Sequence, residues 1–353
     1  MNNPTVLVGS YAAADQPGIY AFAFDPASGT LTPRGSFAGV SSPSFLALHP
    51  NGRWLFSVSE TSDSSGAGGG VAALEIDLGG AELACRLVNT QPSQGAHPCH
   101  LAIDPSGGWL LVSNYSSGSF GALPINSDGS LGPIASFHQH SGTGPNTQRQ
   151  ERAHAHSATF SPDGRFAIVA DLGIDQLMVY AFDPADGTLT PHGRGQAAPG
   201  AGPRHLAFHP SGRTLYAANE LGNTVALYDY DAESGALSPR GSLETLPSGA
   251  PESYVADIHI APDGGRLYVS NRGHNSLAAY DVAADGGLTL AAIESCGGDW
   301  PRNFALAPGG QFALVANQNS GDIAVLPLGG PGAIGPAVEH AAVPGASFVQ
   351  FVG

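Results

Sequence analysis

The sequence predicts an all-β fold, a seven-bladed β-propeller formed as a single domain by residues 1–353, and three observations support this. A proline-glycine turn recurs six times at intervals of about fifty residues. The segments between the turns are short apolar blocks bounded by Gly, Pro, Asp and Asn, as strands require, and none has a long helical period. The two ends of the chain read as complementary parts of a seventh unit.

The recurring turn marks six complete units, each of which reads as four short strands. Residues 203–243 show the pattern clearly, with four apolar blocks separated by polar turns. The six turns are HPNG (49–52), DPSG (104–107), SPDG (161–164), HPSG (209–212), APDG (261–264) and APGG (307–310).

The seventh unit is divided between the chain ends. Residues 5–37 supply three strands but lack the first, and the C-terminal segment ASFVQFVG (346–353) resembles that missing strand. We expect the two segments to pair, which closes the ring and leaves no open sheet edge. No linker interrupts the period, and the longest irregular stretch is 138–153.

Composition excludes several classes of protein. All thirteen basic residues are arginine, so the chain lacks the lysine of a Walker A loop, a Schiff base or a Ser-x-x-Lys nucleophile. The net charge of −16 argues against nucleic acid or an anionic membrane as partner. No signal-peptide pattern or membrane-length apolar run occurs, and three isolated cysteines predict no disulfide framework. We expect a cytoplasmic monomer that uses no cofactor.

The repeat also serves as an internal control for finding a site, because a position that only maintains the fold should look alike in every unit. The first strand of each blade lines the channel of a propeller. Six residues before the turn proline, the units carry Ser44, Cys99, His156, Arg204, Ala256 and Arg302; the next position carries Phe45, His100, Ser157, His205, Asp257 and Asn303.

A second variable position follows the end of the second strand. The recurrent Ser, Asn or Asp there is expected to satisfy backbone groups, and the residue after it is Glu60, Tyr115, Leu172, Glu220, Arg272 or Gln318. An antiparallel second strand ends beside the start of the first. Both variable positions therefore lie at one end of the ring, where we predict a cluster of His156, Arg204, Glu220, Arg272 and Arg302.

Arg204, Arg272 and Arg302 do not lie at the recurring turns, where other arginines of the chain are found. Their presence is therefore not explained by the repeat. Guanidinium groups gathered in an acidic protein suggest an anionic ligand, because they bind phosphate or carboxylate through two parallel hydrogen bonds. The competing interpretation is that each arginine pairs with a carboxylate such as Glu220. Both interpretations stay open at this point.

Histidines raise the question of a metal. His154 and His156 share a strand face, and His138 and His140 precede them, so together they could be ligands. No carboxylate or cysteine completes a ligand spacing, so we predict no metal. Cys99 is interpreted as a small buried apolar residue.

Several segments resemble one enzyme family, the seven-bladed propeller lactonases, and the resemblance covers nearly the whole chain. The segments are RQERAHAHS (149–157), ADLGIDQ (170–176), GPRHLAFHP (202–210), NEL (219–221), SNRGHNS (270–276) and PRNFALAPGGQFALVANQ (301–318). The resemblance implies catalytic roles for His156, Arg204, Glu220 and Arg272, without a metal. We expect further substrate contacts from Arg302, His154, His100, His205 and Gln318.

The function implied by the resemblance is hydrolysis of a small anionic substrate, a phosphorylated sugar lactone, with 6-phosphogluconolactone first among the candidates. Glu220 or His156 is expected to take a proton from the attacking water, and Arg204 or Arg272 to stabilise the oxyanion. Two alternatives belong to other classes: a muconate-type cyclase whose arginines hold carboxylates, and a propeller that binds a ligand without catalysis.

Overall fold

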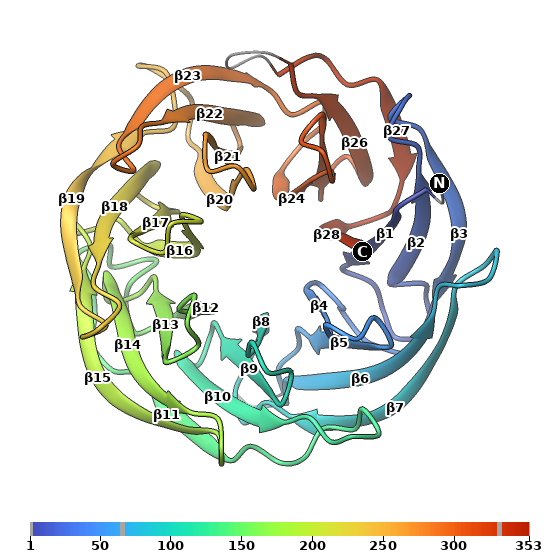
Figure 1. Cartoon of the computed structure of the whole chain (residues 1–353), viewed down its shortest axis with the longest axis horizontal. Coiled ribbons are helices and arrows are strands. Elements are labelled where there is room, and N and C mark those ends of the chain that lie inside the picture. The colour runs from blue at the N-terminus through green and yellow to red at the C-terminus, as the bar shows by residue number, and fades with distance from the viewer. Residues whose placement is uncertain (1–2, 64–67, 330–333, 353) are drawn as a thin grey trace.

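The computed structural model describes residues 3–63, 68–329 and 334–352, which form 28 strands in seven four-stranded antiparallel sheets. The sheets surround a central channel as the blades of a ring, which confirms the predicted seven-bladed propeller (Figure 1). Within the described ranges, no helix is long and apolar enough to cross a membrane.

Each blade contributes one strand to each of four concentric positions (Figure 1). The innermost strands are β28 (Ala346–Val352), β4 (Leu46–Leu48), β8 (Pro98–Ile103), β12 (Ala155–Phe160), β16 (Pro203–Phe208), β20 (Tyr254–Ile260) and β24 (Pro301–Leu306). The second strands are β1 (Thr5–Ser10), β5 (Trp54–Ser59), β9 (Trp109–Asn114), β13 (Phe166–Asp171), β17 (Thr214–Asn219), β21 (Arg266–Arg272) and β25 (Phe312–Asn317). The third strands are β2 (Ile19–Phe24), β6 (Gly70–Asp77), β10 (Ser119–Pro124), β14 (Gln176–Asp183), β18 (Thr224–Tyr230), β22 (Ser276–Val282) and β26 (Asp322–Pro327). The outer strands are β3 (Leu31–Phe37), β7 (Ala84–Pro92), β11 (Ser136–Gln139), β15 (Thr188–Gln196), β19 (Leu237–Glu244), β23 (Leu288–Ser295) and β27 (Glu339–Ala342).

The ring closes through the chain ends, as predicted. Strand β28 pairs with β1 from Thr5↔Val352 to Ser10↔Ala346, and the two termini lie in the same blade (Figure 1). Only Gly353 of the predicted closing segment lies outside the described residues. Because β28 and β2 flank β1, the strand has no edge at which another chain could add.

The apolar cores lie between neighbouring blades. One cluster combines Val8 and Phe24 of the first blade with Leu314 and Val325 of the last. Second strands pack on both faces, so β17 and β25 are buried at every residue, whereas the outer β15 and β19 are largely exposed. This packing explains why the second strand of each unit reads as an uninterrupted apolar block.

A β-bulge recurs near the start of the innermost strands. In β12, Ala155 pairs with Asp171 and Ser157 with Ala170, which leaves His156 between them without a partner residue on β13. Arg204 in β16 and Arg302 in β24 lie in the same place in their ladders. A bulge re-aims the extra side chain, so this repeated irregularity presents one variable residue near the channel on each of β8, β12, β16 and β24.

Candidate functional site

Glu220, which follows β17, lies at the centre of three guanidinium groups. Its Oε2 accepts from Nε of Arg204 at 3.1 Å and is 2.8 Å from NH2 of Arg272, and its Oε1 accepts from Arg149. Arg204 comes from the bulge of β16, Arg272 from the end of β21, and Arg149 from the irregular stretch before β12. The structure therefore brings Arg204, Glu220 and Arg272 together, as the two variable repeat positions predicted.

The charge of Glu220 is fixed by these contacts. Burial alone would raise the pKa of its carboxyl group, but the charges of Arg272, Arg204 and Arg149 lower the pKa to about 2. Both oxygens are occupied and the group stays ionised at neutral pH. Arg204 and Arg272 therefore pair with the Glu220 carboxylate, as one of the two interpretations from the sequence predicted. Because the pKa of Glu220 is low, its carboxylate is a weak proton acceptor.

His156 offers the opposite chemistry, a neutral imidazole with an unused nitrogen. Its Nδ1 lies 3.8 Å from Sγ of Cys99, whose thiol donates to the His156 carbonyl at 3.1 Å. In the described ranges Nε2 has no hydrogen-bond partner. Burial, followed by the charge of Arg204, holds the pKa of His156 well below its usual 6.5.

A buried hydrogen-bond chain fixes Arg204. Its NH1 donates to Ala256 O at 2.6 Å and to Nε2 of His205 at 3.0 Å, so His205 carries its proton on Nδ1 and donates to Oδ1 of Asp257 at 2.7 Å. Asp257 also accepts from His259 at 2.9 Å. His205 therefore contacts the cluster through Arg204 and positions it.

The remaining predicted residues lie in different places. His100 and His205 line a cavity of about 500 Å³ that extends along the later residues of the innermost strands. His154 is bound elsewhere, with Nδ1 3.0 Å from Tyr115 O and Nε2 3.3 Å from Glu151. Gln318 follows β25, at the repeat position of Glu220, and its Oε1 is buried without a partner among the described residues.

The histidines that precede β12 serve the interface between blades. His140 bonds Asp171 at 2.7 Å and Tyr180 at 2.9 Å, and His138 bonds Leu189 O at 2.8 Å. In the part of the chain that the structure describes, no group of three or more His, Cys, Asp or Glu side chains could hold a metal ion.

A second carboxylate and arginine face each other at the same end of the channel. Oε2 of Glu60 accepts from Tyr11 at 2.7 Å and from Ser44, and its Oε1 is 3.9 Å from NH2 of Arg302. Glu60, Arg302 and Arg204 line one small cavity of about 10 Å³ with Cys99. This cavity is too small for a sugar, so a ligand of that size would contact the cluster from its exposed side.

Sequence reasoning missed Arg149, Glu60 and Tyr11. Arg149 had a usable signal, since it is one of the few arginines outside the repeated turn positions. Glu60 had a better one, because it occupies the repeat position of Glu220 in another blade. Tyr11 had the same signal as Glu60, because it directly follows Ser10 at the end of the second strand β1. Its N–H donates to Gly345 O, just as the N–H of Glu220 donates to Gly202 O.

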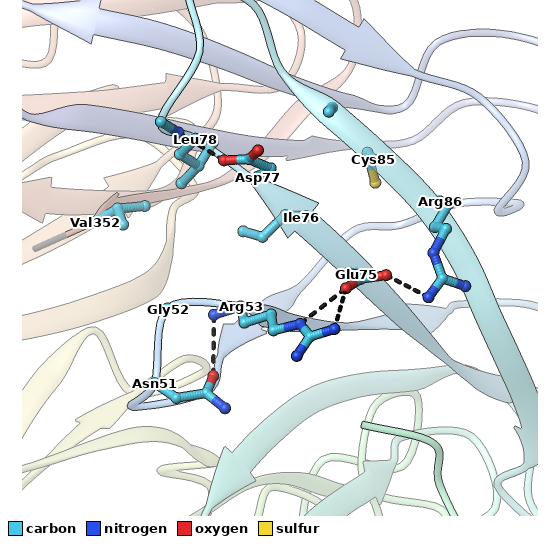
Figure 2. A pocket seen from close by; sticks show the side chains of 12 residues that line it. Asn51, Gly52, Arg53, Glu75, Ile76, Asp77, Leu78, Cys85, Arg86 and Val352 are labelled. Atoms are coloured by element: carbon cyan, nitrogen blue, oxygen red, sulfur yellow. Dashed lines mark hydrogen bonds and ion pairs between the residues drawn. The ribbon is translucent and has the colours of Figure 1, made fainter. Parts of the chain in front are cut away.

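Two pockets that are larger than the cavity beside Arg302 are lined by residues other than those of the Glu220 and Arg302 clusters. A groove of about 680 Å³ adjoins the Glu220 cluster, lined by Asn146, Leu221 and Tyr254 among others. A pocket of about 660 Å³ lies on the blade β4–β7, where Arg53 and Arg86 both pair with Glu75 (Figure 2). The second pocket contains no histidine and no residue of the predicted site.

Acid should destabilise the protein through its buried neutral histidines. Burial, aided by Arg204, lowers the pKa of His205 to about 4, from 6.5 in an unfolded chain. The unfolded state then binds more protons between these values, so stability is complete above pH 6.5 and is lost as the pH falls towards 4. His205 alone should contribute a loss of roughly 3 kcal/mol.

Urea unfolding at pH 7 and pH 4.5 measures this loss. His205→Gln should lose part of the pH dependence because glutamine does not titrate. Equal unfolding free energies of the wild type at the two pH values would contradict the depressed pKa.

Comparisons with known proteins agree with this architecture. The family model described as Lactonase, 7-bladed beta-propeller matches residues 5–351. A 6-phosphogluconolactonase of Bacillus subtilis is 36% identical, and the match covers 90% of this chain and 88% of that protein. A putative 6-phosphogluconolactonase from Bacteroides fragilis superposes with a TM-score of 0.91 at 31% identity over 100% of this chain and 98% of the other. A periplasmic gluconolactonase of Pseudomonas aeruginosa reaches 0.91 at 32% identity over 99% of both chains.

Proposed function

Because this chain belongs to the seven-bladed β-propeller lactonase family, we propose that it hydrolyses a phosphorylated sugar lactone, with 6-phosphogluconolactone as substrate. The relatives named for that activity cover nearly the whole chain at 36% identity. The residues of the proposed site are His156, Arg204, Glu220 and Arg272.

One observation carries the proposal: a neutral imidazole with a free nitrogen lies among positive charges. Hydrolysis of a lactone needs a base for the attacking water and positive charge for the carbonyl oxygen. Nε2 of His156 is the proposed base. Arg204 and Arg272 are the proposed source of positive charge, and both lie near enough for their charges to act on the His156 imidazole. The lowered pKa keeps the imidazole unprotonated at neutral pH.

In the proposed reaction, water attacks the lactone carbonyl carbon while Nε2 of His156 removes one proton. The carbonyl oxygen becomes an oxyanion, and Arg204, the cation whose charge acts most strongly on His156, supplies positive charge to stabilise it. The intermediate then collapses, the bond from the carbonyl carbon to the ring oxygen breaks, and the proton returns from His156 to that oxygen. The carboxylic acid product ionises and releases one proton.

Glu220 has a supporting role in this proposal. It accepts hydrogen bonds from Arg204 and Arg149 and pairs with Arg272, and it offsets charge that would otherwise repel within a buried cluster. The role of proton acceptor falls to His156, one of the two residues that the sequence left open.

The test is hydrolysis of 6-phosphogluconolactone beside glucono-lactone, each corrected for spontaneous opening. A kcat/KM well above background for the phosphorylated lactone supports the proposal. Preference for glucono-lactone would move the assignment to an unphosphorylated substrate, the class named for the Pseudomonas neighbour. Turnover of a muconate with neither lactone opened would instead support the cyclase.

The site of action is proposed to be the cytoplasm, with the chain a monomer. The three cysteines Cys85, Cys99 and Cys296 are all free, which suits a reducing compartment. Cell fractionation and size-exclusion chromatography test the two parts of this statement, and recovery from the periplasm or elution as a dimer would contradict them.

A further inference from the structure

The arginines of the cluster differ in how many of their N–H groups the protein already uses. Nε and NH1 of Arg204 donate to Glu220, His205 and Ala256 O. Nε and NH2 of Arg272 donate to Tyr254 O at 3.3 Å and Val255 O at 3.0 Å, and NH2 also contacts Glu220. These two guanidinium groups have few donors left for a ligand.

Arg302 is the exception. Its guanidinium makes no hydrogen bond to any residue in the described ranges, and its closest carboxylate oxygen, Oε1 of Glu60, is 3.9 Å away. That separation is too long for a hydrogen bond. The side chain is 18% exposed, so its five N–H donors lie at the border of the solvent without a partner in the protein.

The surroundings hold this free guanidinium in place. Tyr11 lies beneath it, with the guanidinium carbon 5.1 Å from the ring centroid, and the Tyr11 hydroxyl donates to Oε2 of Glu60. Ser44 donates to the same oxygen, so the carboxylate is held on one side. Only NH2 of Arg302 approaches Glu60, which leaves Nε and NH1 for an external oxyanion.

A second unused group lies on the same blade. Gln318 follows β25, its backbone N–H donates to Trp300 O at 3.0 Å, and its amide oxygen is buried without a partner among the described residues. An unpaired buried polar atom is costly unless a ligand or solvent completes it. Arg302 and Gln318 thus present unused donors and an unused acceptor from one blade.

His156 and Arg302 lie on different blades, an arrangement that suits a ligand with a polar group at each end. His156 lies in the blade β12–β15 and Arg302 in the blade β24–β27, on different sides of the channel (Figure 1). Arg302 nevertheless lies near enough for its charge to lower the pKa of His156, after burial, Arg204 and His205. A phosphorylated sugar lactone likewise has its carbonyl at one end and its phosphate at the other.

We propose that Arg302 is the residue that binds the phosphate of the substrate, with Tyr11 and Glu60 as positioning residues that hold its guanidinium. The assignment rests on the proposed lactonase function. A guanidinium with free adjacent N–H groups binds a phosphate through two parallel hydrogen bonds, which gives both strength and orientation. Arg302 therefore sets the preference for a phosphorylated over an unphosphorylated lactone.

Arg302→Gln tests the assignment on both substrates. The KM for 6-phosphogluconolactone should rise roughly 10- to 100-fold, because charged hydrogen bonds are lost. The KM for glucono-lactone should stay within about twofold of the wild-type value, because that substrate never makes the contact. Arg213→Gln, which removes an exposed arginine from a repeated turn, is the matched control and should leave both values unchanged.

Two further variants separate binding from folding. Arg302→Lys keeps the charge but not the fork, so its KM for the phosphorylated lactone should lie between those of the wild type and Arg302→Gln. Tyr11→Phe removes only the hydroxyl that holds Glu60, and should raise this KM by a few-fold with kcat unchanged. Equal effects of Arg302→Gln on both lactones, or no effect on either, would overturn the assignment.

Binding of inorganic phosphate provides a test that does not depend on turnover. Calorimetry should detect binding to the wild type and to Arg213→Gln, and at least tenfold weaker binding to Arg302→Gln. If neither lactone is hydrolysed, the proposed function fails, and phosphate binding alone decides the role of Arg302. Phosphate binding that survives in Arg302→Gln would reject it.

Discussion

Replacing His156 with glutamine is expected to lower kcat for the lactone by about 10²–10⁴-fold, the usual contribution of a positioned general base. Glutamine keeps a polar side chain of similar reach but cannot accept a proton at neutral pH. Its unfolding free energy should change far less than its activity, because Nε2 of His156 has no partner to lose among the described residues. Steady-state kinetics beside thermal unfolding make the comparison.

The pH profile of the wild type offers a second measurement on this residue. Because burial and Arg204 hold the pKa of His156 below 6.5, the unprotonated base persists into mild acid. The acidic limb of kcat/KM should therefore fall below pH 6.5, provided the fold survives there. His192→Gln, on the outer strand β15, is the matched control. Wild-type turnover in His156→Gln would remove the imidazole from the mechanism.

Glu220→Gln is expected to destabilise the protein by roughly 3–5 kcal/mol, the usual cost of removing one partner from a buried ion pair. Arg204 and Arg272 would lose their counter-charge, and both side chains are almost fully buried. Arg149 would lose the same partner, although its side chain is 34% exposed. The melting temperature and the urea midpoint should both fall, and activity should fall because the arginines no longer keep their places.

The chain contains a matched control for this variant. Glu75 also lies between two arginines, Arg53 and Arg86, but in the exposed pocket on the blade β4–β7 (Figure 2). Glu75→Gln should hardly change the melting temperature, because solvent screens ion pairs at the surface. If Glu220→Gln instead keeps its stability and loses turnover, Glu220 is the proton acceptor and His156 has the supporting role.

The repeat allowed much of the fold and part of the site to be predicted. A turn that recurs every fifty or so residues defines equivalent positions, and equivalent positions adopt equivalent places in a ring. His156, Arg204 and Arg302 could therefore be selected as departures from the pattern, and the structure shows His156, Arg204 and Arg302 as bulged residues of β12, β16 and β24. Closure by residues 346–352 followed from the need to cover the edge of β1.

Contacts outside the repeat could not be predicted in this way. Arg149 reaches Glu220 from the irregular stretch before β12, where no periodicity fixes a position. Tyr11 and Glu60 occupy equivalent repeat positions in neighbouring blades, but the repeat does not specify that the Tyr11 hydroxyl donates to Glu60. His154 was expected to contact the substrate, yet its imidazole is bound to Tyr115 O and Glu151.

The sequence by itself determined the ring, the end of the channel at which the variable residues gather, and the types of chemical group found there. Only the tertiary structure decided which of those groups remain available. Arg204 and Arg272 are identical in chemistry to Arg302, but Glu220 and backbone carbonyls occupy them and leave Arg302 without a hydrogen bond in the described ranges. The physical reason is that a hydrogen bond depends on distances between blades far apart in the chain, which the order of residues within one repeat does not specify.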